Sequence, residues 1–169
     1  PRYWLLVALL AALIGFVMWE RTFPAHSLRY RFSVEVETPE GIKTGSSVIE
    51  VRYSWGPSIG DVSGFKSRIW GDAVYVDLGA GRNLVVTLTR SESGRKTARS
   101  PAELPFSLFD IDSARSQLWK ITLLDGSSDV PPEMLPLLVT FRDLADPMSV
   151  ERVEPDQLDT AFGPGVRIA

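Results

Sequence analysis

Residues 28–37 read LRYRFSVEVE, and this stretch decides the fold class. Apolar and polar side chains alternate at every position, which is the period of a β-strand with one buried and one solvated face. A second alternating run, SVIEVRYSW at 47–55, follows the turn residues TPEG at 38–41. The two runs together predict a β-hairpin.

A second hairpin is predicted by AVYVDL at 73–78 and NLVVTLT at 83–89. The connection GAGR at 79–82 suits a turn whose residues need positive φ. It lacks the full spacing of a phosphate-binding loop, and no helix pattern follows it. We therefore interpret it as a turn.

Shorter signals complete the β-rich pattern. Residues 104–124 fit either a short helix or a strand. Other signals predict strands at 135–141 and 149–153 and a helix at 155–163. The sequence therefore predicts a mainly β chain, with an antiparallel β-sandwich or small barrel-like domain at residues 28–169 that includes one or two short helices.

Ahead of this domain, the run WLLVALLAALIGFVMW at 4–19 contains sixteen residues without a charge. The bulky Met18 and Trp19 stand where a signal peptidase needs small side chains, so we expect the segment to be retained. A helix of this length spans about 24 Å of a hydrocarbon core of roughly 30 Å. Residues 1–21 are therefore predicted to form a short transmembrane anchor helix. Its predicted membrane-interface anchors are Tyr3, Trp4, Trp19 and Arg21.

The predicted helix has two unlike faces. At about 100° per residue, small side chains gather on one face, at Ala8, Ala11, Ala12 and Gly15. The opposite face carries larger side chains, at Leu6, Leu10, Leu13 and Val17. A face of small residues lets a second helix approach closely, although Ala and Gly are frequent in membrane helices generally. The segregation favours a helix–helix interface with an integral membrane protein as the partner.

The charges flanking the segment bear on its orientation. Arg2 precedes it, whereas Arg21, Arg29 and Arg31 follow it, and this balance favours a cytoplasmic domain. However, long domains are translocated largely regardless of charge, and an apolar segment this close to the N-terminus is typical of an uncleaved export signal. We therefore expect a single-pass protein of the bacterial inner membrane, with a short linker at 22–27 and a periplasmic domain.

Composition excludes several other classes of function. A net charge of −3 gives no electrostatic case for a nucleic-acid partner. Cys is absent, so neither a disulfide framework nor a thiolate metal site can form. A chain of 169 residues is long enough to bury a hydrophobic core that is stable without disulfides or a structural metal.

Candidate catalytic residues are few, so we expect no enzyme activity and no cofactor, and we identify no small-molecule substrate. His26 is the single histidine, and a place in the linker is favoured over a metal site or a Ser-His-Asp triad. Asp110 and Asp112 form a D-x-D pair that could hold a divalent ion, but such pairs are common near helix caps.

Aromatic residues suggest one contact surface in the domain. Trp55 and Trp70 flank a glycine-rich loop at 56–69 that includes Phe65. A loop rimmed by aromatic side chains at a sheet end is a candidate contact patch, and core packing is the alternative. A basic loop at 90–103 is rich in Ser, and we name no site there.

Three stretches carry a resemblance: TGSSVIEVRY at 44–53, LVTFRDLADPMSVERVEP at 138–155 and FGPGV at 162–166. In these the chain resembles an uncharacterised group of alphaproteobacterial membrane-anchored proteins with a β-rich domain. The resemblance implies a bacterial inner-membrane setting. The group has no known activity, so it implies no site residues.

Three functions follow from these features. The first is a non-enzymatic accessory or assembly subunit that docks through its transmembrane helix onto a larger bacterial membrane complex. The alternative is a membrane-tethered periplasmic binding module for a ligand, lipid or cell-wall component, using the loop between Trp55 and Trp70. The third, an enzyme that uses Asp110 and Asp112 with a divalent ion, rests on the D-x-D spacing alone.

Overall fold

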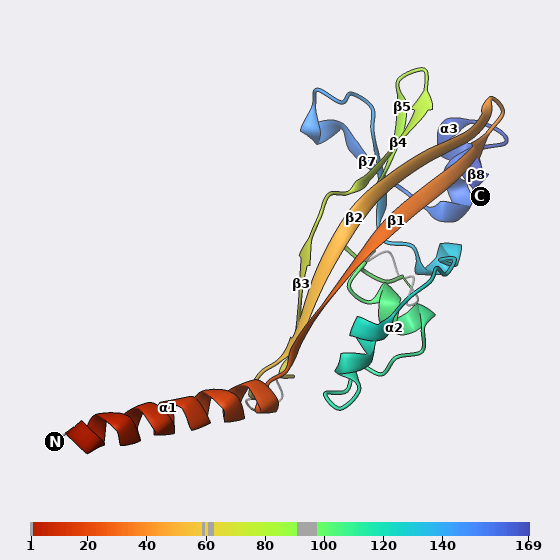
Figure 1. Cartoon of the computed structure of the whole chain (residues 1–169). Coiled ribbons are helices and arrows are strands. Elements are labelled where there is room, and N and C mark those ends of the chain that lie inside the picture. The colour runs from red at the N-terminus through yellow and green to blue at the C-terminus, as the bar shows by residue number, and fades with distance from the viewer. Residues whose placement is uncertain (1, 59, 61–62, 91–97) are drawn as a thin grey trace.

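The computed structural model describes residues 2–58, 60, 63–90 and 98–169. An apolar helix, α1 (Arg2–Thr22), precedes a domain built mostly of strands (Figure 1). The strands are β1 (Ala25–Thr38), β2 (Gly41–Trp55), β3 (Phe65–Trp70), β4 (Val74–Gly79), β5 (Arg82–Val86), β6 (Leu138–Phe141), β7 (Val150–Val153) and β8 (Arg167–Ile168). The short helices are α2 (Leu104–Leu108), η1 (Leu118–Leu123), η2 (Pro132–Met134), η3 (Pro147–Ser149), η4 (Pro155–Gln157) and α3 (Leu158–Phe162).

The strands form two four-stranded antiparallel sheets. The first has the order β3–β2–β1–β8 and the second has the order β4–β5–β6–β7. The expected mainly β fold, with an N-terminal apolar helix and a few short helices, is therefore confirmed.

The alternating stretch that opened the sequence analysis lies within β1. This strand pairs with β2 along its whole length, from Ala25 opposite Ser54 to Thr38 opposite Gly41. Alternate side chains of β1, such as Val34 and Val36, are buried in the core, and those between them are exposed on the outer face of the sheet. The alternation of apolar and polar residues in the sequence therefore matches the alternation of buried and exposed side chains along β1.

The hairpin is longer than the second sheet can cover. β1 has 14 residues, about 46 Å of strand, whereas β4 to β7 have four to six residues each. The second sheet packs on the half near the turn, where Gly45 faces the carbonyl oxygen of Tyr75. The half next to α1 is covered by α2 and η1 (Figure 1). Leu84 of the second sheet and Leu118 of η1 belong to the same core.

A buried side-chain amide completes the second sheet. Asn83 is fully buried in β5, and its Nδ2 donates to the carbonyl oxygen of Phe141 at 2.8 Å. Its Oδ1 accepts the backbone N–H of the same Phe141 at 2.9 Å. The backbone pairing of β5 with β6 covers Val85 opposite Val139, two residues away. The amide therefore replaces the next backbone pair of the ladder.

The junction between α1 and the first sheet consists of Phe23 and Pro24. The backbone N–H of Trp55, in β2, donates to the carbonyl oxygen of Pro24 at 3.1 Å. The N–H of Phe23 donates to the carbonyl oxygen of Trp19 at 2.8 Å, which continues the helical hydrogen bonding. These bonds fasten the start of β1 directly to the end of α1.

Several boundaries differ from the sequence-based expectation. β1 begins at Ala25, so His26 lies in a strand rather than in a linker, opposite Tyr53. The predicted loop at 56–69 ends in strand β3, which pairs with β2 as an edge strand. The ambiguous segment 104–124 contains α2 and η1, which are helical rather than extended. Parts of the predicted loops, residues 59, 61–62 and 91–97, lie outside the described residues.

Candidate functional site

The predicted helix interface lies on α1, and the domain leaves it uncovered. The segment Tyr3–Thr22 has a mean hydropathy of 1.9, and none of it is buried. The predicted interface residues are all exposed: Ala8, Ala11, Ala12 and Gly15. This helix is long and apolar enough to span a membrane. Exposed apolar surfaces of this extent generally mark sites that contact a membrane or another protein.

The predicted membrane-interface anchors lie at the two ends of α1. Tyr3 and Trp4, at its N-terminal end, are the most exposed large hydrophobic side chains in the described part of the helix, at 79% and 78%. Trp19 and Arg21 lie at the other end, and the ring of Trp19 packs on that of Phe23 with centroids 4.5 Å apart. This end of the helix therefore packs against the junction that leads into β1.

The structure brings together two of the three aromatic residues of the predicted contact patch. Trp55 lies opposite Phe65 in the pairing of β2 with β3, and their ring centroids are 5.8 Å apart. Trp70 lies opposite Glu50, five residues along β2 from Trp55. An odd number of residues separates the two, so Trp70 is on the other face of the sheet. The three side chains therefore do not form one surface.

Aromatic side chains of the first sheet fasten the segment 101–113 to its inner face. Tyr30 Oη donates to the carbonyl oxygen of Pro101 at 2.7 Å, and Tyr53 Oη donates to that of Ala102 at 2.9 Å. Trp55 Nε1 donates to the carbonyl oxygen of Ser113 at 3.3 Å. Burial raises the pKa of both tyrosine hydroxyls, and the proximity of Tyr30 raises the pKa of Tyr53 further.

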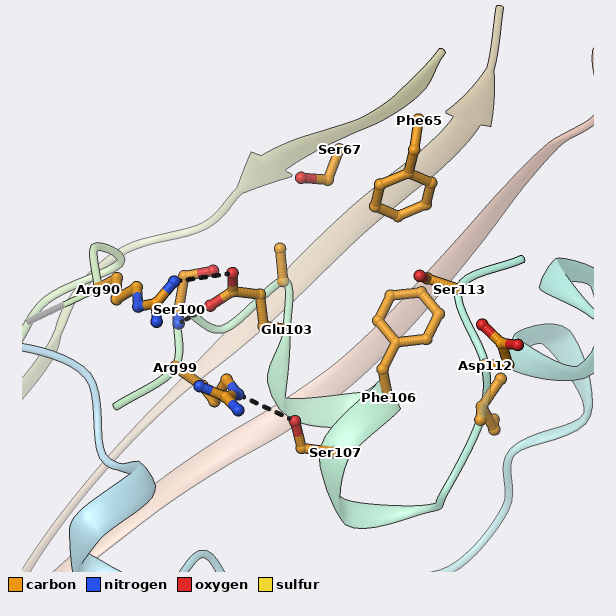
Figure 2. Close-up of a pocket in the computed structure, with 12 residues that line it drawn as sticks. Phe65, Ser67, Arg90, Arg99, Ser100, Glu103, Phe106, Ser107, Asp112 and Ser113 are labelled. Carbon is orange, nitrogen blue, oxygen red and sulfur yellow. Dashed lines mark hydrogen bonds and ion pairs between the residues drawn. The ribbon is translucent and has the colours of Figure 1, made fainter. Parts of the chain in front are cut away.

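A groove of about 780 Å³ opens between β3 and this segment (Figure 2). Phe65 and Phe106 line one end, with ring centroids 6.0 Å apart. Figure 2 shows Arg90, Arg99 and Glu103 at the other end, where Arg99 Nε donates to Ser107 Oγ at 3.2 Å, and it shows Asp112 near Phe106. There Glu103 accepts the backbone N–H of Ser100 at 2.9 Å. The charged groups of the groove are therefore already engaged in contacts within the protein.

The candidate metal pair has local roles in a turn. Asp112 Oδ1 accepts the backbone N–H of Ala114 at 2.9 Å, and Asp110 has a positive φ of 49°. Asp tolerates this conformation and often bonds the backbone two residues ahead in turns. In the part of the chain that the structure describes, no cluster of three or more His, Asp or Glu side chains is arranged to hold a metal ion.

The outer face of the first sheet carries a feature that the sequence analysis did not single out. Near α1, the strands β1, β2 and β3 present five exposed basic side chains, here called the basic patch: Arg29, Arg31, Arg52, Lys66 and Arg68. None of the five forms an ion pair with another described residue. The patch borders a groove of about 500 Å³, which is lined by Arg52, Ser54, Lys66, Ser67, Arg68 and Trp70.

Two of these cations face each other directly. Arg52 in β2 lies opposite Arg68 in β3, and like charges at such a position destabilise a sheet. Sequence reasoning missed the patch because its residues come from three strands and because β3 was taken as loop. The only signal in FKSRIW is a weak one: Lys66 and Arg68 are two positions apart, with Phe65 and Ile69 on either side of them.

Comparison of the chain with models of protein families, with curated proteins and with solved structures finds no match.

Proposed function

We propose that the chain is a non-enzymatic, single-pass membrane protein that acts as an accessory or assembly subunit of a larger bacterial membrane complex. In this proposal α1 both anchors the domain and docks onto an integral membrane partner. The inner membrane is the proposed location, and the β-rich domain is on the periplasmic side.

The observation that carries the proposal is the uncovered surface of α1. The helix ends at a junction of only two residues, and the domain beyond it has its own continuous core. The helix therefore contributes nothing to that core, and its apolar surface is free for lipid and for a second helix. Lipid contacts large and small side chains alike, whereas a second helix gains close backbone packing at Ala8, Ala12 and Gly15.

The proposal predicts that added bulk on the small-residue face disrupts docking. In the double variant Ala12→Leu/Gly15→Leu, recovery of the partner with the tagged full chain should fall at least about tenfold, because overpacking costs about 1–3 kcal/mol per site. Membrane insertion and the near-ultraviolet circular dichroism of the domain should not change. The measurement is quantitative mass spectrometry after extraction in a mild detergent.

A matched control adds bulk to the opposite face. The variant Leu10→Phe/Val17→Leu leaves the small-residue face intact, so it should retain the partner at the wild-type level. Equal recovery with both double variants and the wild-type chain would contradict docking through this face. Equal losses with both variants would show that the whole helix surface, rather than the small-residue face, determines the association.

A second candidate function is supported by the groove in Figure 2, which could make the domain a membrane-tethered binding module. Two phenyl rings beside hydroxyl and charged groups suit an amphipathic ligand such as a cell-wall glycopeptide. Titration of the full chain with soluble peptidoglycan fragments should then change the fluorescence of Trp55, whose ring contacts Phe65. The variant Ser107→Leu, which narrows the groove without adding a tryptophan, should abolish that response. No fluorescence change in either protein would argue against this function.

A further inference from the structure

The basic patch lies at the end of the first sheet that is joined to α1. In the row of residues nearest the helix, Lys66 lies opposite Ser54, and Ser54 lies opposite Ala25. Only Phe23 and Pro24 separate Ala25 from α1. Neighbouring strands are about 4.8 Å apart, so the backbone of Lys66 is about 10 Å from that of Ala25.

The rest of the patch follows within a short length of strand. Arg52 and Arg68 lie in the second outward-facing row, and Arg29 lies in the third. Arg31, in the fourth row, is six residues from Ala25, or about 20 Å along β1. Every member of the patch therefore lies within about 20 Å, along the strands, of the end of the sheet that is joined to α1.

Charges are segregated along this face. Toward the hairpin turn, β1 presents Glu35 and Glu37, and Arg167 Nε donates to Glu37 at 2.6 Å. Near α1, the same face carries the five cations of the patch and one carboxylate, Glu50. A face that is merely solvated gains nothing from such separation, because it brings Arg52 and Arg68 together without a counter-ion among the described residues.

The groups in the patch suit phosphate oxygens. Guanidinium and ammonium groups form charge-assisted hydrogen bonds to phosphate, and the hydroxyl of Ser54, on the same face, lines the same groove as a further donor. Trp70 lies at the edge of this groove with 47% of its surface exposed. Indole rings at protein surfaces near a bilayer favour the headgroup level.

We propose that the basic patch binds the anionic phospholipid headgroups of the bilayer in which α1 is embedded. This inference rests on the membrane anchoring in the proposed function. It extends that function, because it assigns the domain a fixed orientation relative to the membrane. Lipid headgroups are the favoured occupant because the two-residue junction holds them near the patch at high local concentration. Binding turns the outer face of β1, β2 and β3 toward the bilayer.

The size of the effect follows from the number of charges. Each basic residue near an anionic surface favours the bound arrangement about fivefold, so loss of three lowers the ratio of bound to lifted domains about 100-fold. Screening acts on the same interaction, because the Debye length falls to about 3 Å at 1 M salt. Binding should therefore weaken in strong salt.

The experiment measures how close the outer face of the first sheet, which carries the basic patch, lies to the lipid headgroups. The chain has no cysteine, so Val48→Cys, opposite Arg31, gives a single site for a fluorescent label. The full chain is placed in nanodiscs of phosphatidylcholine, or of phosphatidylcholine mixed with phosphatidylglycerol, that carry a spin-labelled headgroup. Quenching of the label should be strong in the mixed discs and weak in the neutral discs.

Charge variants distinguish the patch from net charge. Quenching in the mixed discs should be lost in Arg52→Gln/Lys66→Gln/Arg68→Gln. It should be retained in a control that removes the same number of cations away from this face, Lys43→Gln/Lys120→Gln/Arg142→Gln. Equal quenching in neutral and mixed discs, or quenching that survives in the patch variant, would overturn the proposal.

Two other outcomes have separate meanings. If the patch variant loses a protein partner while its quenching is unchanged, the patch binds an acidic protein surface and the lipid proposal is wrong. If the chain does not enter the discs at all, the anchoring itself fails, and both proposals fall. Normal insertion without lipid-dependent quenching overturns the patch proposal only and leaves the proposed function standing.

Discussion

Replacement of Tyr53 by Phe tests how the domain is held together in the half of the first sheet next to α1. The hydroxyl of Tyr53 is fully buried and donates to the carbonyl oxygen of Ala102 at 2.9 Å. Its ring packs edge-on against Phe106 with centroids 4.9 Å apart, and Phe would keep that contact. The substitution therefore removes one hydrogen bond without removing the ring, and it leaves the carbonyl of Ala102 without this donor.

The expected cost follows from the loss of that donor. A buried acceptor that loses its partner destabilises a protein by about 1–3 kcal/mol, so the free energy of unfolding of Tyr53→Phe should fall by this amount near pH 8. Tyr75→Phe is the matched control, because Tyr75 is 45% exposed on β4. Its effect should be within about 0.5 kcal/mol of zero.

The same variant should respond differently to alkaline pH. Burial raises the pKa of Tyr53 in the folded chain, so above about pH 10 the unfolded chain loses the phenol proton while the folded chain keeps it. The unfolded state then binds fewer protons, and stability falls by about 1.4 kcal/mol per pH unit for each such tyrosine. Tyr53→Phe removes this loss for one tyrosine, and the loss due to Tyr30 remains.

The two stability curves should therefore converge. The wild-type chain is more stable at pH 8, and its advantage should shrink as the pH rises above about 10. The assay is urea unfolding of the full chain in detergent micelles, followed by tryptophan fluorescence from pH 8 to about pH 11.5, where the phenol of the unfolded chain is ionised. A variant as stable as the wild-type chain at pH 8, or a stability difference that does not change with pH, would refute the reasoning.

Two further substitutions test the second sheet by the same unfolding assay. Asn83→Ala should lower the free energy of unfolding by about 2–4 kcal/mol, because both backbone groups of Phe141 lose a partner; a loss below about 1 kcal/mol would mean that water replaces the amide. Gly45→Ala should lower the free energy of unfolding by about 1–3 kcal/mol or more, since its added Cβ would lie 2.2 Å from the carbonyl oxygen of Tyr75. The neighbouring, exposed Ser46→Ala is its control, and an equally mild effect at both positions would contradict close packing of β2 on β4.

The elements that could be predicted from the sequence are those with a strong local signal. Strict alternation predicted the pairing of β1 with β2, and an uncharged run predicted the long apolar helix. The first signal arises from burial, since one side of a strand must be apolar. The second is a long run without a charge, which is typical of a helix able to span a membrane. Prediction of the second hairpin, at β4 and β5, depended on the glycines of its turn, and Gly79 and Gly81 do have positive φ.

The parts that could not be predicted depend on contacts between distant residues. β3 lies at a sheet edge and is mostly exposed, so its sequence FKSRIW has little apolar periodicity to mark it. Trp55 and Trp70 were grouped because they flank one stretch of chain, but side-chain direction in β2 and β3 separates them. The basic patch needed three paired strands to become visible. Both the separation of Trp55 from Trp70 and the assembly of the basic patch depend on the register of the strands, which the sequence alone does not give.

The measurement that tests the central claim most directly is the native size of the protein in its own membrane. The tagged full chain would be extracted in a mild detergent, separated by size and analysed by mass spectrometry. The account predicts migration far above the 18.7 kDa of one chain in a micelle, together with an integral membrane protein at a fixed ratio. Migration of the chain alone, under conditions that keep other membrane complexes intact, would contradict it.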